Sequence, residues 1–165
     1  MSEAASSAWY LAPMIEIALS HGDIGPREIE EIAGLFEACF GQASDTDFAE
    51  RVREKRRPLA LIARDGGKAV GYKLGYERSR GVFFSWLGGV LPSRRRLGIA
   101  RELLRRQHAW CEENGYTKVL TESTNRWKEM LILNLTEGFD IMGVHLDANC
   151  ALHVEMRKEL GDSTS

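Results

Sequence analysis

Residues 82–100 constrain the fold most, because they place a buried strand, a short basic turn and a helix start in direct succession. Aromatic and branched side chains dominate 82–90, which predicts a buried strand, and the adjacent Gly88 and Gly89 indicate a bulge or a close backbone approach. From Ile99 the apolar residues recur at helical spacing until residues 114–115, an Asn-Gly pair expected to end the helix. This order is typical of a phosphate cradle.

The start of this helix lacks a side chain that could cap it. No Ser, Thr, Asp or Asn occupies the immediate cap position, so the first backbone N–H groups need another acceptor. An anion would serve, because Gly98 keeps the space clear and the run Arg94, Arg95, Arg96 adds positive charge. An ordinary basic turn with water at the helix end is the alternative.

The composition indicates one domain and narrows the set of partners. The chain has 165 residues, of which 44% are hydrophobic and 28% charged, with a formal net charge of -2. This balance argues against broad electrostatic binding to nucleic acid. Three widely spaced cysteines without a Cys-x-x-Cys pair predict neither a disulfide framework nor a metal site. No membrane span or signal peptide is recognised, so we expect a cytoplasmic protein with no membrane, nucleic-acid or metal partner.

The pattern along the chain predicts a flexible N-terminal arm (1–13), a single domain (14–160) and a C-terminal tail (161–165). Strands are expected at 15–19, 59–64, 69–76, 82–90, 118–123, 139–146 and 150–158, and helices at 26–40, 45–55, 99–113 and 127–137. The order β-α-α-β-β-β-α-β-α-β-β predicts an α+β fold with a mixed, mostly antiparallel sheet flanked by helices. The fourth and fifth strands should be parallel, with their carboxyl ends facing one cleft.

Residues 95–100, Arg-Arg-Leu-Gly-Ile-Ala, resemble the Arg/Gln-x-x-Gly-x-Gly/Ala signature of the GCN5-related N-acetyltransferase (GNAT) family. That signature lies between the family's fourth strand and third helix. Two further segments are similar to the family, the Val-x-Pro at 90–92 and the Met-x-x-x-Asn-x-x-x-Gly-Phe at 130–139. With the element order, the resemblance extends over about residues 15–160.

The resemblance implies that the chain binds acetyl-CoA or another short acyl-CoA. Backbone N–H groups of 95–100 would hold the pyrophosphate, and nearby arginines would add salt bridges. The pantetheine arm would follow the exposed edge of the fourth strand, where it splays from the fifth, although the paired glycines also fit a bulge required by packing. The residues expected to contact the cofactor are Gly88, Gly89, Val90, Arg95, Arg96, Leu97, Gly98, Ile99, Ala100, Arg101 and Asn125.

Two catalytic positions depart from the family pattern. Family members usually transfer the acyl group directly to a bound amine, with a tyrosine of the fourth helix as the acid, but Asn134 stands at that position. An amide can donate a hydrogen bond to the sulfur without giving up a proton, so water would protonate the thiolate. The fourth strand also lacks the family's usual glutamate, and Glu122 is the best substitute, followed by Glu77, His145 and Glu129. A structural or solvated role for Glu122 is the alternative.

Aromatic side chains suggest where the acceptor amine would bind. Trp86, Trp127 and Tyr72, with Tyr76, are candidates for the wall of a pocket for an apolar or aromatic amine, although strand aromatics are also typical of a core. His108 and His153 are interpreted as structural. The resemblance also implies a possible homodimer through the late strands.

Three functions therefore remain open from the sequence. The first is an acyl-CoA-dependent N-acetyltransferase that acts on a primary amine of a small molecule or a peptide. The second is a GNAT-like module that binds CoA thioesters as a sensor without turnover. The third is a domain whose basic helix start binds other phosphorylated ligands or RNA.

Overall fold

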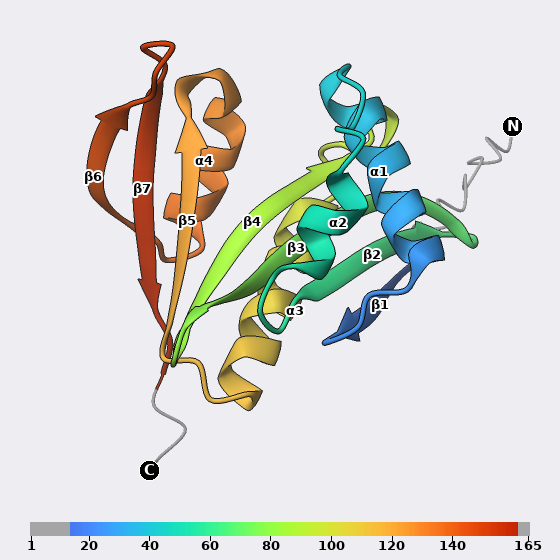
Figure 1. Ribbon diagram of the computed structural model, residues 1–165, viewed down its shortest axis with the longest axis horizontal. Helices are drawn as coiled ribbons and strands as arrows, with labels where there is room; N and C mark the ends of the chain where they lie inside the picture. The colour runs from blue at the N-terminus through green and yellow to red at the C-terminus, as the bar shows by residue number, and fades with distance from the viewer. Residues whose placement is uncertain (1–13, 162–165) are drawn as a thin grey trace, which may run out of the picture.

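The computed structural model describes residues 14–161, in which four helices and seven strands form one mixed sheet with helices on both faces (Figure 1). The predicted arm lies outside the described residues, as does all but the first residue of the predicted tail. The strands are β1 Ile15–His21, β2 Leu59–Asp65, β3 Lys68–Ser79, β4 Val82–Val90, β5 Lys118–Thr124, β6 Asp140–Leu146 and β7 Leu152–Glu159. The α-helices are α1 Pro26–Phe40, α2 Phe48–Arg53, α3 Ile99–Glu113 and α4 Lys128–Thr136.

The sheet has the strand order β1-β2-β3-β4-β5-β7-β6 and is antiparallel at every pair except β4 with β5. Two glycines join β2 to β3, and their φ angles of 57° and 86° suit the left-handed positions of a tight hairpin turn. Helix α3 is the crossover between the parallel pair. The predicted fold class and element order are therefore confirmed.

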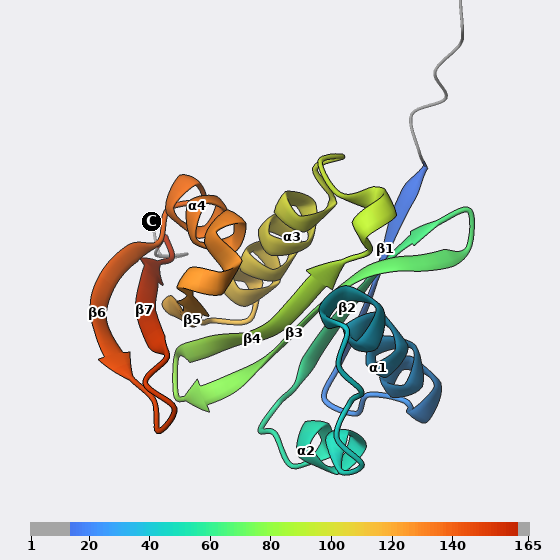
Figure 2. The same cartoon turned by 90° about the horizontal axis from the view of Figure 1, so that it is seen from above.

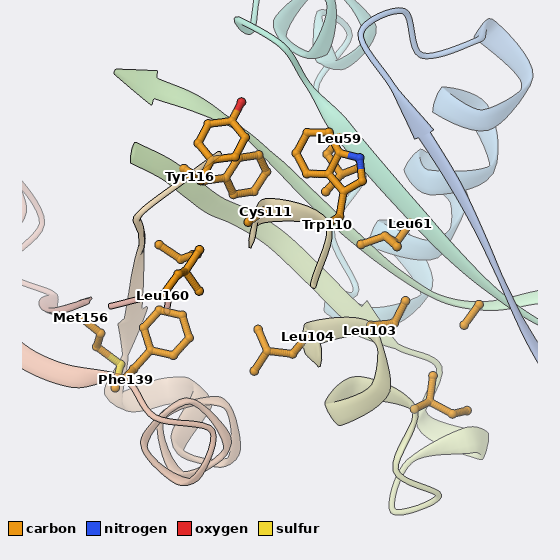
Figure 3. Close-up of a cluster of buried hydrophobic side chains, with 14 of the residues drawn as sticks. Leu59, Leu61, Leu103, Leu104, Trp110, Cys111, Tyr116, Phe139, Met156 and Leu160 are labelled. Atoms are coloured by element: carbon orange, nitrogen blue, oxygen red, sulfur yellow. The ribbon is translucent and has the colours of Figure 1, made fainter. Parts of the chain in front are cut away.

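Helices cover the two faces of the sheet and divide the core in two. Figure 2 shows α3 and α4 on one face and α1 and α2 on the other. On the α3 side, Phe83, Leu103 and Leu104 pack with Phe139, which directly precedes β6, and with Met156 of β7; Figure 3 shows Phe139 and Met156 in this cluster. On the α1 side, the apolar stripe of α1 packs against β2 and β3 through Ile29, Ile32, Leu35, Ile62, Tyr72 and Leu74. Burial of these side chains fixes both layers around the sheet.

The parallel pair is short, and this splits the sheet. Only Val82–Ser85 pair with Lys118–Thr121, and beyond these residues β4 and β5 separate. Figure 1 shows the two strands meeting at one end and spreading toward the other. A register shift between Leu74 and Gly75 bulges β4 against β3 just where the divergence begins. The backbone edge of β4 after Ser85 consequently has no strand partner on the β5 side.

Some element boundaries differ from the prediction. The helix expected at 45–55 is shorter, Phe48–Arg53, and the Asp45 carboxylate binds Arg51 and does not cap the helix. The helix expected at 127–137 begins one residue later, after a 3₁₀ turn at Asn125–Trp127 (η2).

The edge strand β6 exposes apolar side chains. Ile141, Met142, Val144 and Leu146 are each half exposed or more. The homodimer stays a prediction. None of the described helices is both long and apolar enough to span a membrane.

Candidate functional site

A cleft of about 1580 Å³ opens where β4 and β5 diverge. Its walls come from β3, β4, β5, the segment leading into α3, η2, α4 and the end of α1, which are far apart in sequence. The cleft brings together Glu122, Asn134, Trp86, Trp127, Tyr72 and every predicted cofactor contact except Leu97, which is half exposed and outside the lining.

The segment 95–100 forms an uncapped helix start at one end of the cleft. Arg96 and Gly98 have φ angles of 64° and 79°, separated by one residue, and α3 begins at Ile99 without a side-chain cap. Left-handed residues in such a turn direct neighbouring backbone N–H groups inward, which makes an anion-binding concavity. A Cβ built on Gly98 meets no atom within 4 Å, so open space lies beside the helix start. The local geometry therefore fits a phosphate group.

The arginines around this segment have different surroundings. Arg95 donates a hydrogen bond from Nε to the Val90 carbonyl at 3.2 Å, which holds the turn. Arg94 and Arg101 pair with Asp65 at 3.1 Å and Glu137 at 2.9 Å. Among residues 14–161, Arg96 has no ion-pair partner and remains exposed. Within the described residues Arg95 likewise has no ion-pair partner, so the charges of Arg95 and Arg96 are both left for a ligand.

The adjacent glycines of β4 are needed for packing on both faces. A Cβ on Gly89 would lie 3.0 Å from the Cys39 Sγ, and one on Gly88 would lie 3.3 Å from the Tyr72 carbonyl and 3.4 Å from the Lys73 Nζ. Both residues also line the cleft along the unpaired edge of β4. The packing therefore requires both glycines, and both also lie on the unpaired edge of β4.

Glu122 takes part in a chain of carboxylates and imidazole on the β5–β7 wall. The His153 Nδ1 contacts the Glu122 carboxylate, while the His153 Nε2 lies 2.9 Å from the Asp147 carboxylate. Asp147 is itself fixed by the backbone N–H groups of Asn149 and Ala151. The hydrogen bond to Asp147 raises the pKa of His153, and the same bond lowers the pKa of Asp147.

His145 completes this cluster. Its ring stacks on His153 with centroids 5.0 Å apart, and its Nε2 lies 3.8 Å from Glu122. The ligand atoms of Glu122, His145 and His153 lie within 4.8 Å of one another, a donor set that a divalent transition metal can use. The interpretation of His153 as merely structural missed this arrangement, because the β5–β7 pairing that places Thr124 opposite His153 joins distant segments.

The remaining candidates for the base and acid occupy different environments. Glu77 lies outside the cleft, 5% exposed, and binds Arg56, Arg57 and the Tyr116 hydroxyl, so the structure gives it a structural role. Glu129 lies on the cleft wall in the first turn of α4. Asn134 also lines the cleft, 3% exposed, with its Nδ2 3.9 Å from the Met156 sulfur.

Aromatic side chains form one wall of the cleft on the α2 side, and cationic side chains outside the lining contact them. Trp86 meets Tyr76 edge-on with centroids 5.8 Å apart, and the Lys55 ammonium lies 4.7 Å from the Trp86 ring. The Arg51 guanidinium covers the same indole at 5.5 Å. Tyr72 lines the cleft and also packs in the α1-side core, where it is 1% exposed; within the described residues its buried hydroxyl has no hydrogen-bond partner.

Lys73 is a cleft residue that the sequence analysis did not single out. It is 7% exposed, and burial lowers its pKa to about 8. No local sequence signal marks it, because a lysine in an alternating strand reads as solvent-facing. His108, by contrast, fits its structural interpretation: its Nδ1 lies 3.1 Å from the Lys158 Nζ, and burial lowers its pKa to about 3.

The split sheet and the uncapped helix start define a class of α+β proteins. In this class an anion-binding turn lies beside a cleft between two diverging strands. The acetyltransferase (GNAT) family profile matches residues 29–128, and the chain belongs to this family. A search of curated proteins returned no significant match.

Solved structures share the fold at low sequence identity. The ribosomal-protein-S18-alanine N-acetyltransferase of Escherichia coli is 12% identical, with a TM-score of 0.75 over 90% of this chain and 97% of that one. Ard1 of Thermoplasma volcanium is 18% identical, with a TM-score of 0.72 over 88% and 99%. A GNAT family acetyltransferase of Elizabethkingia anophelis with acetyl-CoA bound is 14% identical, with a TM-score of 0.68 over 88% and 98%.

Proposed function

We propose that this protein transfers the acetyl group of acetyl-CoA directly to a primary amine of a small molecule or a peptide. One observation carries the proposal: the uncapped start of α3 opens onto a cleft that continues through the gap between β4 and β5 to Glu122. A long donor with an anionic end and a thioester end matches this shape. The E. anophelis structure with acetyl-CoA bound supports the same donor.

The residues along the cleft suit successive parts of the donor. The N–H groups of 95–100, with the free charge of Arg96, would hold the pyrophosphate. The unpaired edge of β4 at Gly88–Val90 would hydrogen-bond the pantetheine amides, since buried backbone groups need partners. Asn125, exposed at the start of η2, lies on the same cleft wall. The donor thus supplies the polar partners that this edge lacks.

The wall formed by β5 and β7, opposite the edge of β4, would receive the amine. Glu122, Asp147 and Glu155 give the β5–β7 surface negative charge around two histidines, which attracts an ammonium group. Water takes one proton from the bound ammonium, and Glu122 accepts the second as the neutral amine nitrogen attacks the thioester carbon. The C–N bond forms, the C–S bond breaks, and its electron pair leaves on the sulfur of CoA. Positioning the amine against the thioester supplies much of the rate. The rings of Trp86, Tyr76 and Trp127, which also line the cleft, favour an apolar or aromatic amine.

A sensor that binds CoA thioesters without turnover is the second candidate. Asn134, enclosed beside Met156, favours it, because an amide at this position supplies no proton. In that case the segment 95–100 would bind the CoA thioester, and no acetyl group would be transferred.

Calorimetric titration with acetyl-CoA, followed by thiol release across a panel of amines, tests both candidates. We expect binding at one site and release with at least one class of amine. Binding without release from any amine would favour the sensor. Failure to bind acetyl-CoA, with ATP or RNA binding in its place, would contradict both.

A further inference from the structure

Lys73 is a buried cation without a counterion. It lies in the middle of β3, is 7% exposed and lines the cleft. Within residues 14–161 no carboxylate forms an ion pair with it. Burying an unpaired ammonium costs several kcal/mol, a cost that folded proteins ordinarily offset with a partner charge. An unpaired cation facing a cleft therefore indicates a ligand that carries or develops negative charge.

The Lys73 side chain crosses β4 toward the gap in the sheet. Lys73 pairs with Gly88 across the β3–β4 ladder. A Cβ built on Gly88 would lie 3.4 Å from the Lys73 Nζ and 3.6 Å from its Cγ, so the side chain lies directly over this glycine. Any larger residue at position 88 would obstruct it. Because β4 leaves β5 after Ser85, the ammonium lies beside the open part of the cleft.

The groups around Lys73 leave its charge uncompensated. Burial lowers the pKa of His108 on helix α3 to about 3, so its imidazole is neutral at physiological pH and gives Lys73 no counter-charge. Lys158 of β7 is a second cation, and its ammonium contacts the His108 Nδ1 at 3.1 Å. Burial, then the charge of Lys158, then the charge of Lys73 lower the pKa of His108.

We propose that Lys73 is the general acid of the reaction and protonates the sulfur of the departing CoA. This inference rests on the proposed function. As the amine nitrogen bonds to the acetyl carbon, the C–S bond breaks and its electron pair goes to sulfur, which takes a proton from the Lys73 ammonium. The amine proton goes to Glu122, and water later returns a proton to Lys73. Lys73 thereby supplies the proton that Asn134 cannot give.

The acidity of Lys73 is suited to this step. Burial brings its pKa to about 8, and an unperturbed thiol has a pKa of about 8.5. Transfer between groups of similar pKa is nearly thermoneutral, the condition under which acid catalysis is efficient. At neutral pH the Lys73 amino group is mostly protonated and can donate a proton to the sulfur.

The first test compares CoA with desulfo-CoA, which lacks the sulfur, by calorimetric titration at pH 8. We expect the wild type to bind CoA about tenfold more tightly, because the ammonium stabilises the thiolate in a charge-assisted hydrogen bond. Lys73→Met should bind the two ligands equally. Lys68→Met is the matched control, since Lys68 is exposed at the start of the same strand, and it should keep the wild-type preference.

The second test separates proton transfer from simple charge. Lys73→Met should lower kcat about 100-fold and remove the fall in rate above pH 8. Lys73→Arg keeps the charge but cannot give up a proton, so we expect it to retain the preference for CoA and not the rate. Lys73→Gln replaces the Met variant if circular dichroism shows that the latter does not fold.

The outcomes distinguish this inference from the function on which it rests. An unchanged preference for CoA in Lys73→Met, or full activity in Lys73→Arg, would overturn the role of Lys73 alone. Acetylation of Lys73 itself by the donor would also overturn it. Binding of neither CoA nor desulfo-CoA by the wild type would overturn the proposed function as well.

Discussion

The space beside Gly98 provides a quantitative test of the phosphate cradle. Gly98 and Gly115 have nearly the same φ angle, 79° and 81°, and a Cβ at either position meets no atom within 4 Å. Gly98 precedes α3 inside the cleft, and Gly115 follows the same helix outside it. Substitution by Glu therefore strains both positions equally, by about 1 to 2 kcal/mol for a left-handed residue. Gly115→Glu is a matched control for Gly98→Glu.

The effect on the donor should differ sharply between the two variants. A carboxylate about 5 Å from a phosphate charge is repelled by about 1 to 3 kcal/mol, depending on the effective dielectric constant. A pyrophosphate carries at least two such charges, so Gly98→Glu should weaken CoA binding roughly 100-fold or more. Gly115→Glu should leave it unchanged. Gly98→Gln, with the same strain and bulk but no charge, should fall between them.

Thermal unfolding and calorimetric titration with CoA measure the two effects separately. We expect Gly98→Glu and Gly115→Glu to lower Tm by similar amounts, which verifies the equal strain. The reasoning about the cradle would be refuted by equal CoA affinity in these two variants. It would also fail if Gly98→Gln lost as much affinity as Gly98→Glu, because charge would then not be the cause.

Three further predictions concern other residues. Glu122→Gln should lower kcat at least about 100-fold and change CoA affinity less than twofold; a normal kcat would remove Glu122 from the chemistry. His108→Gln should flatten the pH dependence of stability. The pKa of His108 is about 3 in the folded state and about 6.5 in the unfolded state. Between about pH 3 and pH 6.5 the unfolded state therefore binds more protons, and stability falls as pH falls. This group should cost the wild type about 1.4 kcal/mol of unfolding free energy per pH unit below about 6.5. If urea unfolding gave wild type and variant the same dependence of unfolding free energy on pH, the prediction would be wrong. Glu77→Gln should cost about 1 to 3 kcal/mol of stability through weaker bonds to Arg56, Arg57 and Tyr116, with kcat unchanged; a loss of kcat without a loss of Tm would show that Glu77 has a catalytic role.

Local patterns predicted the elements that position the cleft. The strand, turn and helix of 82–113 follow each other without a break, so periodicity, glycines and the missing cap were sufficient to predict the cradle. The hairpin at Gly66 and Gly67 was predicted for the same reason, since the chemistry of a tight turn is local.

Residues brought together by long-range pairing escaped prediction. Val70 and Tyr72 are two apart, yet they pack in opposite cores, because the register shifts between Ala63 and Arg64 on the neighbouring strand. Simple alternation therefore cannot tell which face Tyr72 or Lys73 occupies. His153 meets Glu122 only through the pairing of β7 with β5. Such contacts depend on strand order and bulges, which one sequence does not display.

The short parallel ladder gives the sheet a mechanical property. Since four residue pairs join β4 to β5, strands β1–β4 and strands β5–β7 form two leaves that meet at one end (Figure 1). A molecule lying in the gap would contact both leaves and tie them together, far from the pairs where they are hinged. Ligand binding would then reduce the motion of the two leaves relative to each other. The backbone amides of β5 and β7 should therefore exchange with solvent more slowly when the gap is filled.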